Sequence, residues 1–194
     1  MLTELLVKIF HNDSKINKMK KLILIFTISG LLYGCSTKDE PIAQTPLSQL
    51  PAATQTGANT FGCLLDGQVF KPDLGNNNFQ CYYQFINGEY FFYIRGSKRI
   101  NAIYSSVYIV SKNKQIAQGQ EYDLKEEVNF GVFGALSIGL PLYITSKINT
   151  GKLKITKLDE INQIVSGTFF FDVVNNQGVK HEIRDGRFDS QYTR

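Results

Sequence analysis

The stretch FQCYYQFINGEYFFYIR, residues 79–95, decides the fold class of this chain. Two runs rich in aromatic residues flank Asn87-Gly88, a pair that supplies the positive φ angles of a two-residue hairpin turn. With these two residues as the turn, Ile86 faces Glu89 across the two strands, and every other pair follows in order. The stretch therefore predicts a β-hairpin with a defined register.

This register divides the side chains of the hairpin into two faces. We expect one face in the core, and it holds Tyr83, Phe85, Tyr90, Phe92 and Ile94. The other face mixes flat rings with amide and guanidinium groups, and it holds Gln80, Tyr82, Gln84, Phe91, Tyr93 and Arg95. Such a mixture can bind a glycan by stacking on the sugar rings and hydrogen bonding to their hydroxyls. The alternative is that a second sheet, a loop or the N-terminal segment covers these rings.

Turn signals continue the β pattern through residues 60–194. Asp66-Gly67, Asn175–Gly178 and Asp185-Gly186 separate further short alternating runs, and no long helical pattern occurs among them. These runs predict one all-β antiparallel domain. Periodicity does not separate a β-sandwich from a partly open barrel, and we favour the sandwich slightly.

The strongest apolar stretch of this domain is VNFGVFGALSIGLPLY, residues 128–143. Its glycines and proline would damage a membrane helix, so we expect a buried strand with a glycine kink or bulge. The alternative is an exposed apolar loop that contacts a partner or lipid.

The N-terminal part of the chain has the pattern of a secretory signal. Lys20 and Lys21 precede the apolar run 22–32, which is much shorter than the roughly 20 residues that a bilayer core requires. Leu32-Tyr33-Gly34-Cys35 then resembles a lipobox, in which cleavage precedes the Cys and its thiol is acylated, for example with palmitate. We expect residues 1–34 to be a signal peptide, with Met19 as the favoured start, and Cys35 to anchor the mature chain in a lipid bilayer.

Removal of residues 1–34 changes the charge balance. The chain has 21 Lys and Arg and 17 Asp and Glu; five of the bases and two of the acids lie in the leader, which leaves 16 and 15. A net charge of +1 lacks the electrostatic footprint of a nucleic-acid binder, so we expect no nucleic-acid partner. Residues 35–59 carry three prolines among Ser, Thr, Gln and Ala, which predicts a flexible tether before the domain of residues 60–194.

The residues with reactive side chains form no catalytic pattern. Cys63 and Cys81 are a candidate disulfide, and His181 is the only histidine after the leader. Asp73 with Asn76–Asn78 offers oxygen ligands for calcium but lacks the spacing of an EF-hand loop, so we expect no metal and no cofactor. No nucleophile, base and orienting group can be assembled. We expect a non-catalytic binding or structural module, and the alternative is an envelope hydrolase that acts on glycan or cell-wall material.

Four stretches carry a resemblance to known proteins: TFGCLLDGQVFKP (60–72), GKLKITKLD (151–159), SGTFFF (166–171) and DGRFD (185–189). Together they resemble the uncharacterised lipoproteins of Bacteroidota, over most of residues 60–192. The resemblance implies an outer-membrane lipoprotein with the bilayer as a partner. The tether, the β-domain and the mixed aromatic face of the hairpin lead us to expect a glycan or another envelope protein as a further partner. The resemblance implies no functional residue beyond the acylated Cys35.

We expect the domain to be displayed on the cell surface, because Lys38-Asp39-Glu40 resembles the signal that sends such lipoproteins to the outer face of the outer membrane. Protease added to intact cells should then cleave the chain, and mass spectrometry should find Cys35 acylated. Protection of the chain until the cells are lysed would contradict surface display and would indicate a position facing the periplasm.

Overall fold

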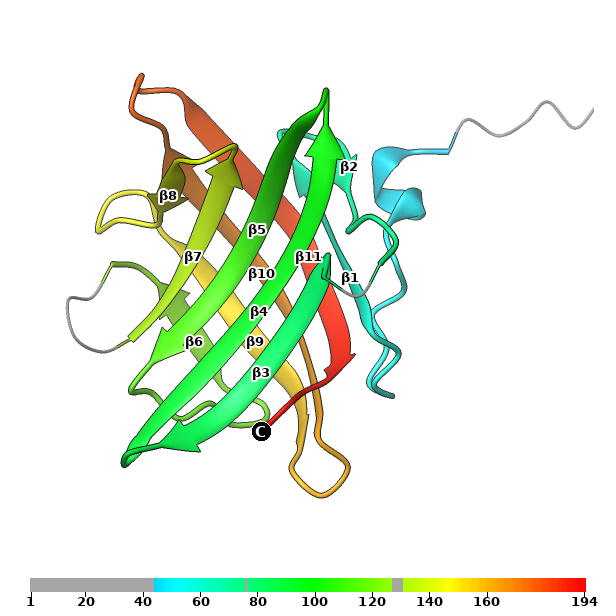
Figure 1. Cartoon of the computed structure of the whole chain (residues 1–194), viewed down its shortest axis with the longest axis vertical. Helices are drawn as coiled ribbons and strands as arrows, with labels where there is room; N and C mark the ends of the chain where they lie inside the picture. Colours follow the sequence, from blue (N-terminus) through cyan, green and yellow to red (C-terminus); the bar gives the residue numbers. More distant parts are fainter. Residues whose placement is uncertain (1–43, 76, 127–130) are drawn as a thin grey trace, which may run out of the picture. The chain divides into compact units, whose positions relative to one another are not determined.

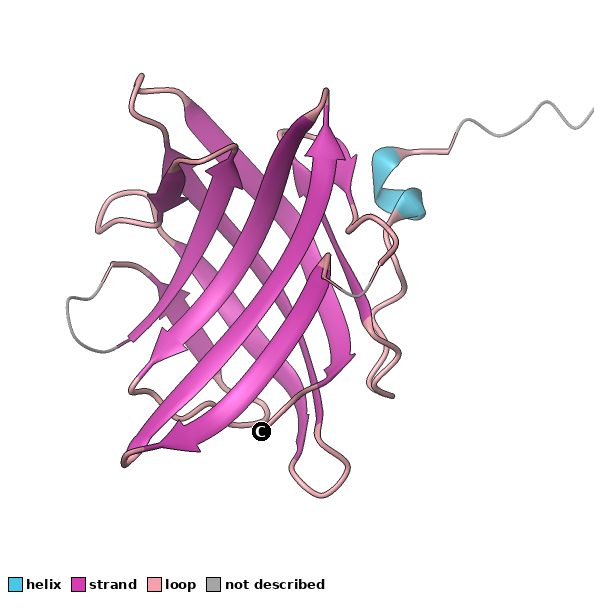
Figure 2. Cartoon of the chain, in the orientation of Figure 1, coloured by secondary structure: helices cyan, strands magenta, loops and turns pink. Residues whose placement is uncertain are grey.

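The computed structural model describes residues 44–75, 77–126 and 131–194, so Cys35 and the predicted signal peptide lie outside the described residues. Apart from one short 3-10 helix, η1 (Pro46–Gln49), the regular structure of the described residues is β-strand (Figure 2). The all-β prediction is confirmed. Within the described ranges, no helix is long and apolar enough to cross a membrane.

The strands follow the turn signals of the sequence. They are β1 (Thr60–Leu65), β2 (Gln68–Phe70), β3 (Phe79–Ile86), β4 (Glu89–Ile100), β5 (Ile103–Lys112), β6 (Glu121–Leu124), β7 (Gly131–Ile138), β8 (Leu142–Ile144), β9 (Gly151–Asp159), β10 (Ile164–Val174) and β11 (Lys180–Gln191). Asp66 and Asn87 have the positive φ angles that their turns require, with Gly67 and Gly88 after them.

All of these strands belong to one open sheet with the order β2-β1-β11-β10-β9-β6-β7-β5-β4-β3, to which β8 adds beside β7. The pairs are antiparallel except for β6 with β7. The end strands β2 and β3 are not neighbours in the sheet, although one isolated bridge joins Tyr82 to Thr193 beyond β11. The sheet curves so that β3, β4, β5 and β7 lie across β1, β11, β10 and β9 (Figure 1). This single curved sheet is the form between a sandwich and a closed barrel.

Aromatic rings and glycines hold the two halves of this sheet together. A Cβ atom on Gly134 of β7 would lie 2.6 Å from the ring of Phe171 on β10, and one on Gly96 of β4 would lie 2.5 Å from the ring of Phe61 on β1. Side chains at these glycines would therefore push the rings away. The absence of a Cβ lets each ring rest directly on the backbone of the opposite half.

The predicted register of the β3–β4 hairpin is confirmed, with Ile86 opposite Glu89. Phe92 and Ile94 are fully buried, as expected for the core face. Phe85 is 62% exposed, so the prediction that it belongs to the core was wrong. Phe85 lies near the hairpin turn, where its ring contacts Tyr90 at a centroid distance of 4.6 Å and lines an open pocket together with Glu160 and Arg194.

The apolar stretch of residues 128–143 contains both a buried strand and an exposed apolar loop, the two alternatives for its sequence. Its first residues, 128–130, lie outside the described residues, and β7 is a strand with Val132 and Leu136 buried. The prediction of a buried strand is confirmed there. Leu140, after the strand, is fully exposed, so the turn between β7 and β8 is an exposed apolar loop.

Residues 50–59 pack on the domain, although their composition indicates a tether. Leu50 is buried, and Pro51 lies against Gly62 of β1. The buried carboxylate of Asp189 on β11 accepts hydrogen bonds from residues of the segment and from β10, namely Thr54 Oγ1 at 2.7 Å, Thr56 N at 2.9 Å, Gly57 N at 2.8 Å, Ala58 N at 3.2 Å and Ser166 Oγ at 2.7 Å. The prediction of a flexible tether was wrong for residues 50–59. The group that binds them, the carboxylate of Asp189, lies far away in the sequence.

Asp189 makes the stability of the domain depend on pH. Burial alone would raise the pKa of this carboxyl group, but the hydrogen bonds from Thr54, Thr56 and Ser166 outweigh burial and hold the pKa well below its usual range. Because the folded pKa is below the unfolded value, the stabilisation is fully present above about pH 4 and is lost as the pH falls towards the folded value.

We predict that Asp189→Asn lowers the free energy of unfolding by about 1–3 kcal/mol at neutral pH, because the amide leaves buried donors without an acceptor. Urea denaturation at about pH 7 and about pH 3 should show the difference from the natural chain shrinking in acid. Asp185→Asn, at an exposed position of the same strand, is the control and should change little. Equal losses for the two variants would contradict the role of Asp189.

Candidate functional site

The outward side of β3, β4 and β5 carries a row of aromatic rings. The ring centroids of Tyr82 on β3 and Tyr93 on β4 are 5.8 Å apart, and those of Tyr93 and Tyr108 on β5 are 6.1 Å apart. All three side chains are half-buried, so an edge or face of each ring is open to solvent. The structure therefore brings the predicted ligand residues Tyr82 and Tyr93 together on one outward surface.

The row is longer than the hairpin sequence alone indicates. Val110 of β5 lies opposite both Tyr93 and Phe133 of β7, which extends the row across four strands. The structure also puts Phe91 beside Lys112, and the Lys112 ammonium lies 5.7 Å from the centre of the Phe133 ring. We name this set the aromatic face: Tyr82, Phe91, Tyr93, Tyr108 and Phe133.

Sequence reasoning missed Tyr108 and Phe133. The alternation in β5 signals that Tyr108 shares a face with Val110 and Lys112. The pairing of β5 with β7 is not local, because β6 intervenes in the sequence, and it cannot be read from alternation. Gln84, which the sequence predicted as a ligand residue, lies opposite Phe91 at the edge of the aromatic face nearest the hairpin turn.

Cations outnumber acids around the aromatic face. On the outward side of β3, β4 and β5 one carboxylate occurs, Glu89 at the hairpin end of β4, and no Asp or Glu occurs in residues 90–120 or 128–158. Arg95 and Lys112 are the cations at the face, and Arg95 also donates a 2.8 Å hydrogen bond to the carbonyl of Asn77. Burial raises the pKa of Tyr93 and the Arg95 guanidinium opposes the rise, so the hydroxyl stays protonated at neutral pH. The surface therefore offers rings, hydroxyl donors and positive charge.

A cleft of about 770 Å³ adjoins the aromatic face where the sheet is open. Its walls come from β3, from the loop after β2, and from β1 and the end of β11; we name it the seam cleft. Tyr82 and Gln80 line the seam cleft and also belong to the outward side of β3. The polar side chains of its other walls are Asn59, Thr60, Lys71, Asp73, Asn77, Ser190, Gln191 and Thr193. A chain lying on the aromatic face can therefore continue into a polar groove.

Cys63 and Cys81 are buried free thiols, so the disulfide that the sequence leaves open is not formed in this structure. Burial raises the pKa of both thiols. That of Cys81 rises to about 12, although a hydrogen bond with Ser190 opposes the rise. A thiolate is the reactive form of cysteine, so neither residue is suited to act as a nucleophile or metal ligand.

His181 is held by two partners. Its Nδ1 lies 2.8 Å from Asp66 Oδ2, and its Nε2 lies 3.5 Å from Asn175 Nδ2. Asn175 Oδ1 accepts hydrogen bonds from the amides of Gln177 and Val179, which directs its NH₂ group towards the imidazole. Nε2 is therefore the acceptor and Nδ1 the donor to Asp66. No Ser, Thr or Cys of the described chain is hydrogen-bonded to His181, so this pair lacks a nucleophile.

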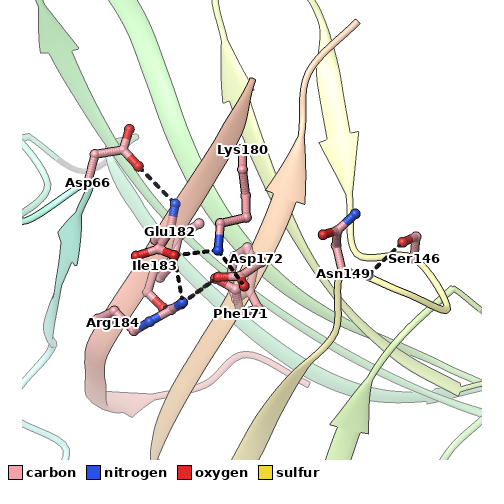
Figure 3. A network of polar contacts seen from close by, with 9 residues as sticks. All are labelled: Asp66, Ser146, Asn149, Phe171, Asp172, Lys180, Glu182, Ile183 and Arg184. Carbon is pink, nitrogen blue, oxygen red and sulfur yellow. Dashed lines mark hydrogen bonds and ion pairs between the residues drawn. The ribbon is translucent and has the colours of Figure 1, made fainter. Parts of the chain in front are cut away.

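The acids on the outward side of β10 and β11 are paired with bases (Figure 3). Asp172 Oδ1 lies 2.6 Å from Arg184 Nη1, and Glu182 Oε1 lies 2.5 Å from Lys180 Nζ. A longer contact of 3.3 Å joins Glu182 to Arg184 and connects the two pairs. The network is electrically balanced and partly exposed, so it contributes little stability. It offers no free carboxylate pair for glycoside cleavage.

Two side chains of the candidate calcium loop, Asp73 and Asn78, are hydrogen-bonded to other parts of the chain. Asp73 Oδ2 accepts a 2.8 Å hydrogen bond from the amide of Arg99, and Asn78 Nδ2 donates to the carbonyl of Leu74. Asn76 lies outside the described residues. Within the described ranges, no three His, Cys, Asp or Glu side chains are grouped so that they could hold a metal ion.

Comparisons of the chain with protein families, with curated proteins and with solved structures found no match. The resemblance to the lipoproteins of Bacteroidota therefore stays a prediction. The aromatic face and the seam cleft are the features on which a functional proposal can rest.

We predict that Cys63 and Cys81 resist alkylation while the domain is folded, because their burial blocks access and disfavours the thiolate. Iodoacetamide added to the native mature chain should leave both unmodified, and the same reagent in concentrated urea should modify both. Mass spectrometry counts the added groups. Rapid labelling of the native protein, or a disulfide in its mass, would contradict the buried thiols.

Proposed function

We propose that this chain is a lipid-anchored envelope protein whose β-domain binds polysaccharide without cleaving it. The aromatic face is the observation that supports the proposal. Its rings lie on neighbouring strands at centroid separations of 5.8 and 6.1 Å, so several platforms follow one another across the sheet. Successive sugar rings can stack on successive platforms, since each aromatic ring offers an apolar surface with polar groups at its border.

The charge of this surface favours an acidic polysaccharide. Arg95 and Lys112 lie beside the aromatic face, while Glu89, at the hairpin end of β4, is the one carboxylate on this side of β3, β4 and β5. A carboxylated sugar bound at the middle of the face would meet guanidinium and ammonium groups. The amides of Gln80 and Asn77, in the adjoining seam cleft, can bind hydroxyl groups of the same chain.

The alternative of an envelope hydrolase receives less support from the geometry. A glycosidase requires two carboxyl groups across a cleft, free to act as acid and base or nucleophile. Asp172 and Glu182 are each bound to a cation, and Asp189 is buried in hydrogen bonds to the chain. In the seam cleft, Asp73 is the one carboxylate among the lining residues, and it accepts the amide of Arg99.

We predict that Tyr82→Ala and Tyr93→Ala each weaken binding of an acidic polysaccharide about tenfold, the upper range of one aromatic contact. The probe is alginate oligosaccharide, with neutral xylan oligosaccharide for comparison, and isothermal titration calorimetry measures both affinities. Alginate should bind more tightly, because of Arg95 and Lys112.

Phe85→Ala is the matched control for this experiment. Phe85 is an exposed ring on the same hairpin but on its other face, so its removal should leave the affinity unchanged. Equal weakening by Phe85→Ala and Tyr93→Ala would place binding elsewhere. Absence of binding to either oligosaccharide would count against the polysaccharide class.

A further inference from the structure

An open hollow of about 410 Å³ lies on the outward side of β9, β10 and β11, strands that carry no part of the aromatic face. Thr168 of β10 is exposed while the next residue, Phe169, is buried, so the Thr168 side chain points away from the core. Lys154 of β9 and Arg187 of β11 lie directly opposite Thr168 on its two sides. All three residues line this space, which we name the outer hollow.

The two cations of the outer hollow are free to bind a ligand. Two strand spacings of about 4.8 Å separate Lys154 from Arg187, and the side chain between them is the short Thr168. Arg187 Nε donates a 3.2 Å hydrogen bond to the carbonyl of Asp185, which fixes the guanidinium beside the bulge of β11. Within the described part of the chain, neither Lys154 Nζ nor the two Nη groups of Arg187 have an acceptor. An ammonium, a guanidinium and a hydroxyl group therefore border the same space.

The nearest acids of β6 are bound to another cation. Glu121 lies opposite Lys154 in the pairing of β6 with β9. Its Oε1 lies 3.0 Å from Lys152 Nζ, and Asp123 Oδ1 lies 3.0 Å from the same nitrogen. Because Lys152 holds both carboxylates, the charge of Lys154 is not used by an ion pair of the described chain.

The two acids of β11 that adjoin Arg187 differ in their freedom to bind. Asp189 is buried, and its carboxylate is filled by hydrogen bonds from residues 54–58. Asp185, outside the ion-pair network of Figure 3, is exposed, and its carboxylate has no partner among the described residues. The outer hollow thus combines two free cations with one free carboxylate, which can accept hydrogen bonds from the hydroxyl groups of a ligand.

An aromatic ring and the N-terminal segment complete the outer hollow. Phe170 lines it, and its side chain is 46% exposed. On the β1 side, Gly62 lies opposite Arg187 and Pro51 packs over Gly62, so Ala53 of the same segment forms a wall. An exposed ring beside hydrogen-bonding groups is suited to the apolar face of a sugar.

We infer that the outer hollow binds a sugar that carries a tetrahedral oxyanion, as a phosphate or a sulfate ester. The oxyanion lies over Thr168, where Lys154, Arg187 and the Thr168 hydroxyl donate hydrogen bonds to its oxygen atoms. The sugar ring stacks on Phe170, and a sugar hydroxyl donates to Asp185.

A tetrahedral oxyanion fits this site better than a carboxylate, because a carboxylate offers two oxygen atoms to donors that come from three strands. The outer hollow and the aromatic face share no strand, so the inference does not depend on the proposed function.

An NMR titration of the protein with glucose 6-phosphate, glucose 6-sulfate, inorganic phosphate and glucose tests the inference. Amide signals report both the affinity and the strands that the probe contacts. Lys154→Gln removes one cation, and Phe170→Ala removes the ring. Lys157→Gln is the matched control, because Lys157 lies on the same strand but is paired with Asp159 at 3.5 Å. Circular dichroism checks the fold of each variant.

We expect one of the two esters to bind about tenfold more tightly than glucose or inorganic phosphate, with signals of β9, β10 and β11 moving. The ester that binds more tightly identifies the oxyanion. Lys154→Gln and Phe170→Ala should each weaken its binding several-fold, and Lys157→Gln should leave it unchanged.

Three outcomes would overturn the inference. Neither ester binds, or the signals that move belong to other strands. The weakening by Lys157→Gln equals that by Lys154→Gln. Inorganic phosphate binds as tightly as the esters, which would remove the sugar from the proposed ligand.

Discussion

The buried carboxylate of Asp189 joins three parts of the chain, and the packing of residues 50–59 on the domain depends on that junction. It binds the segment around Thr54, which lies 135 residues earlier, and it also binds Ser166 of β10. The neighbouring residues of the same motifs have packing roles: the ring of Phe188 fills the space in which Gly167 has no Cβ. The SGTFFF and DGRFD stretches are therefore explained by the fold, and the aromatic face lies on other strands.

The junction at Asp189 also makes residues 50–59 part of the folded domain. Leu50 is buried, and the amides of Thr56 and Gly57 are hydrogen-bonded to the Asp189 carboxylate. Under the proposed function, the link to an acylated Cys35 would therefore consist of the residues before this segment.

The sequence predicted those features of the fold that depend on residues close together in the chain. Asn87-Gly88 specifies its turn, and the turn specifies which residues of β3 and β4 share a face, so the grouping of Tyr82 with Tyr93 followed from the sequence. The exposure of Phe85 depends on how the end of the hairpin meets Glu160 and Arg194, which are distant in the sequence. The neighbours Tyr108 and Phe133 depend on pairing across an intervening strand, and the binding of residues 50–59 depends on Asp189. These non-local contacts have no sequence periodicity that could reveal them.

Hydroxyl-radical footprinting of the protein, with and without alginate oligosaccharide, tests the central claim most directly. Tyrosine rings oxidise when solvent reaches them, and a bound polysaccharide shields the rings on which it lies. The account predicts that oxidation of Tyr82, Tyr93 and Tyr108 falls when alginate is added, while oxidation of Tyr122, on β6 and outside the aromatic face, stays constant. Unchanged oxidation of the three tyrosines under conditions in which alginate is bound would contradict the account.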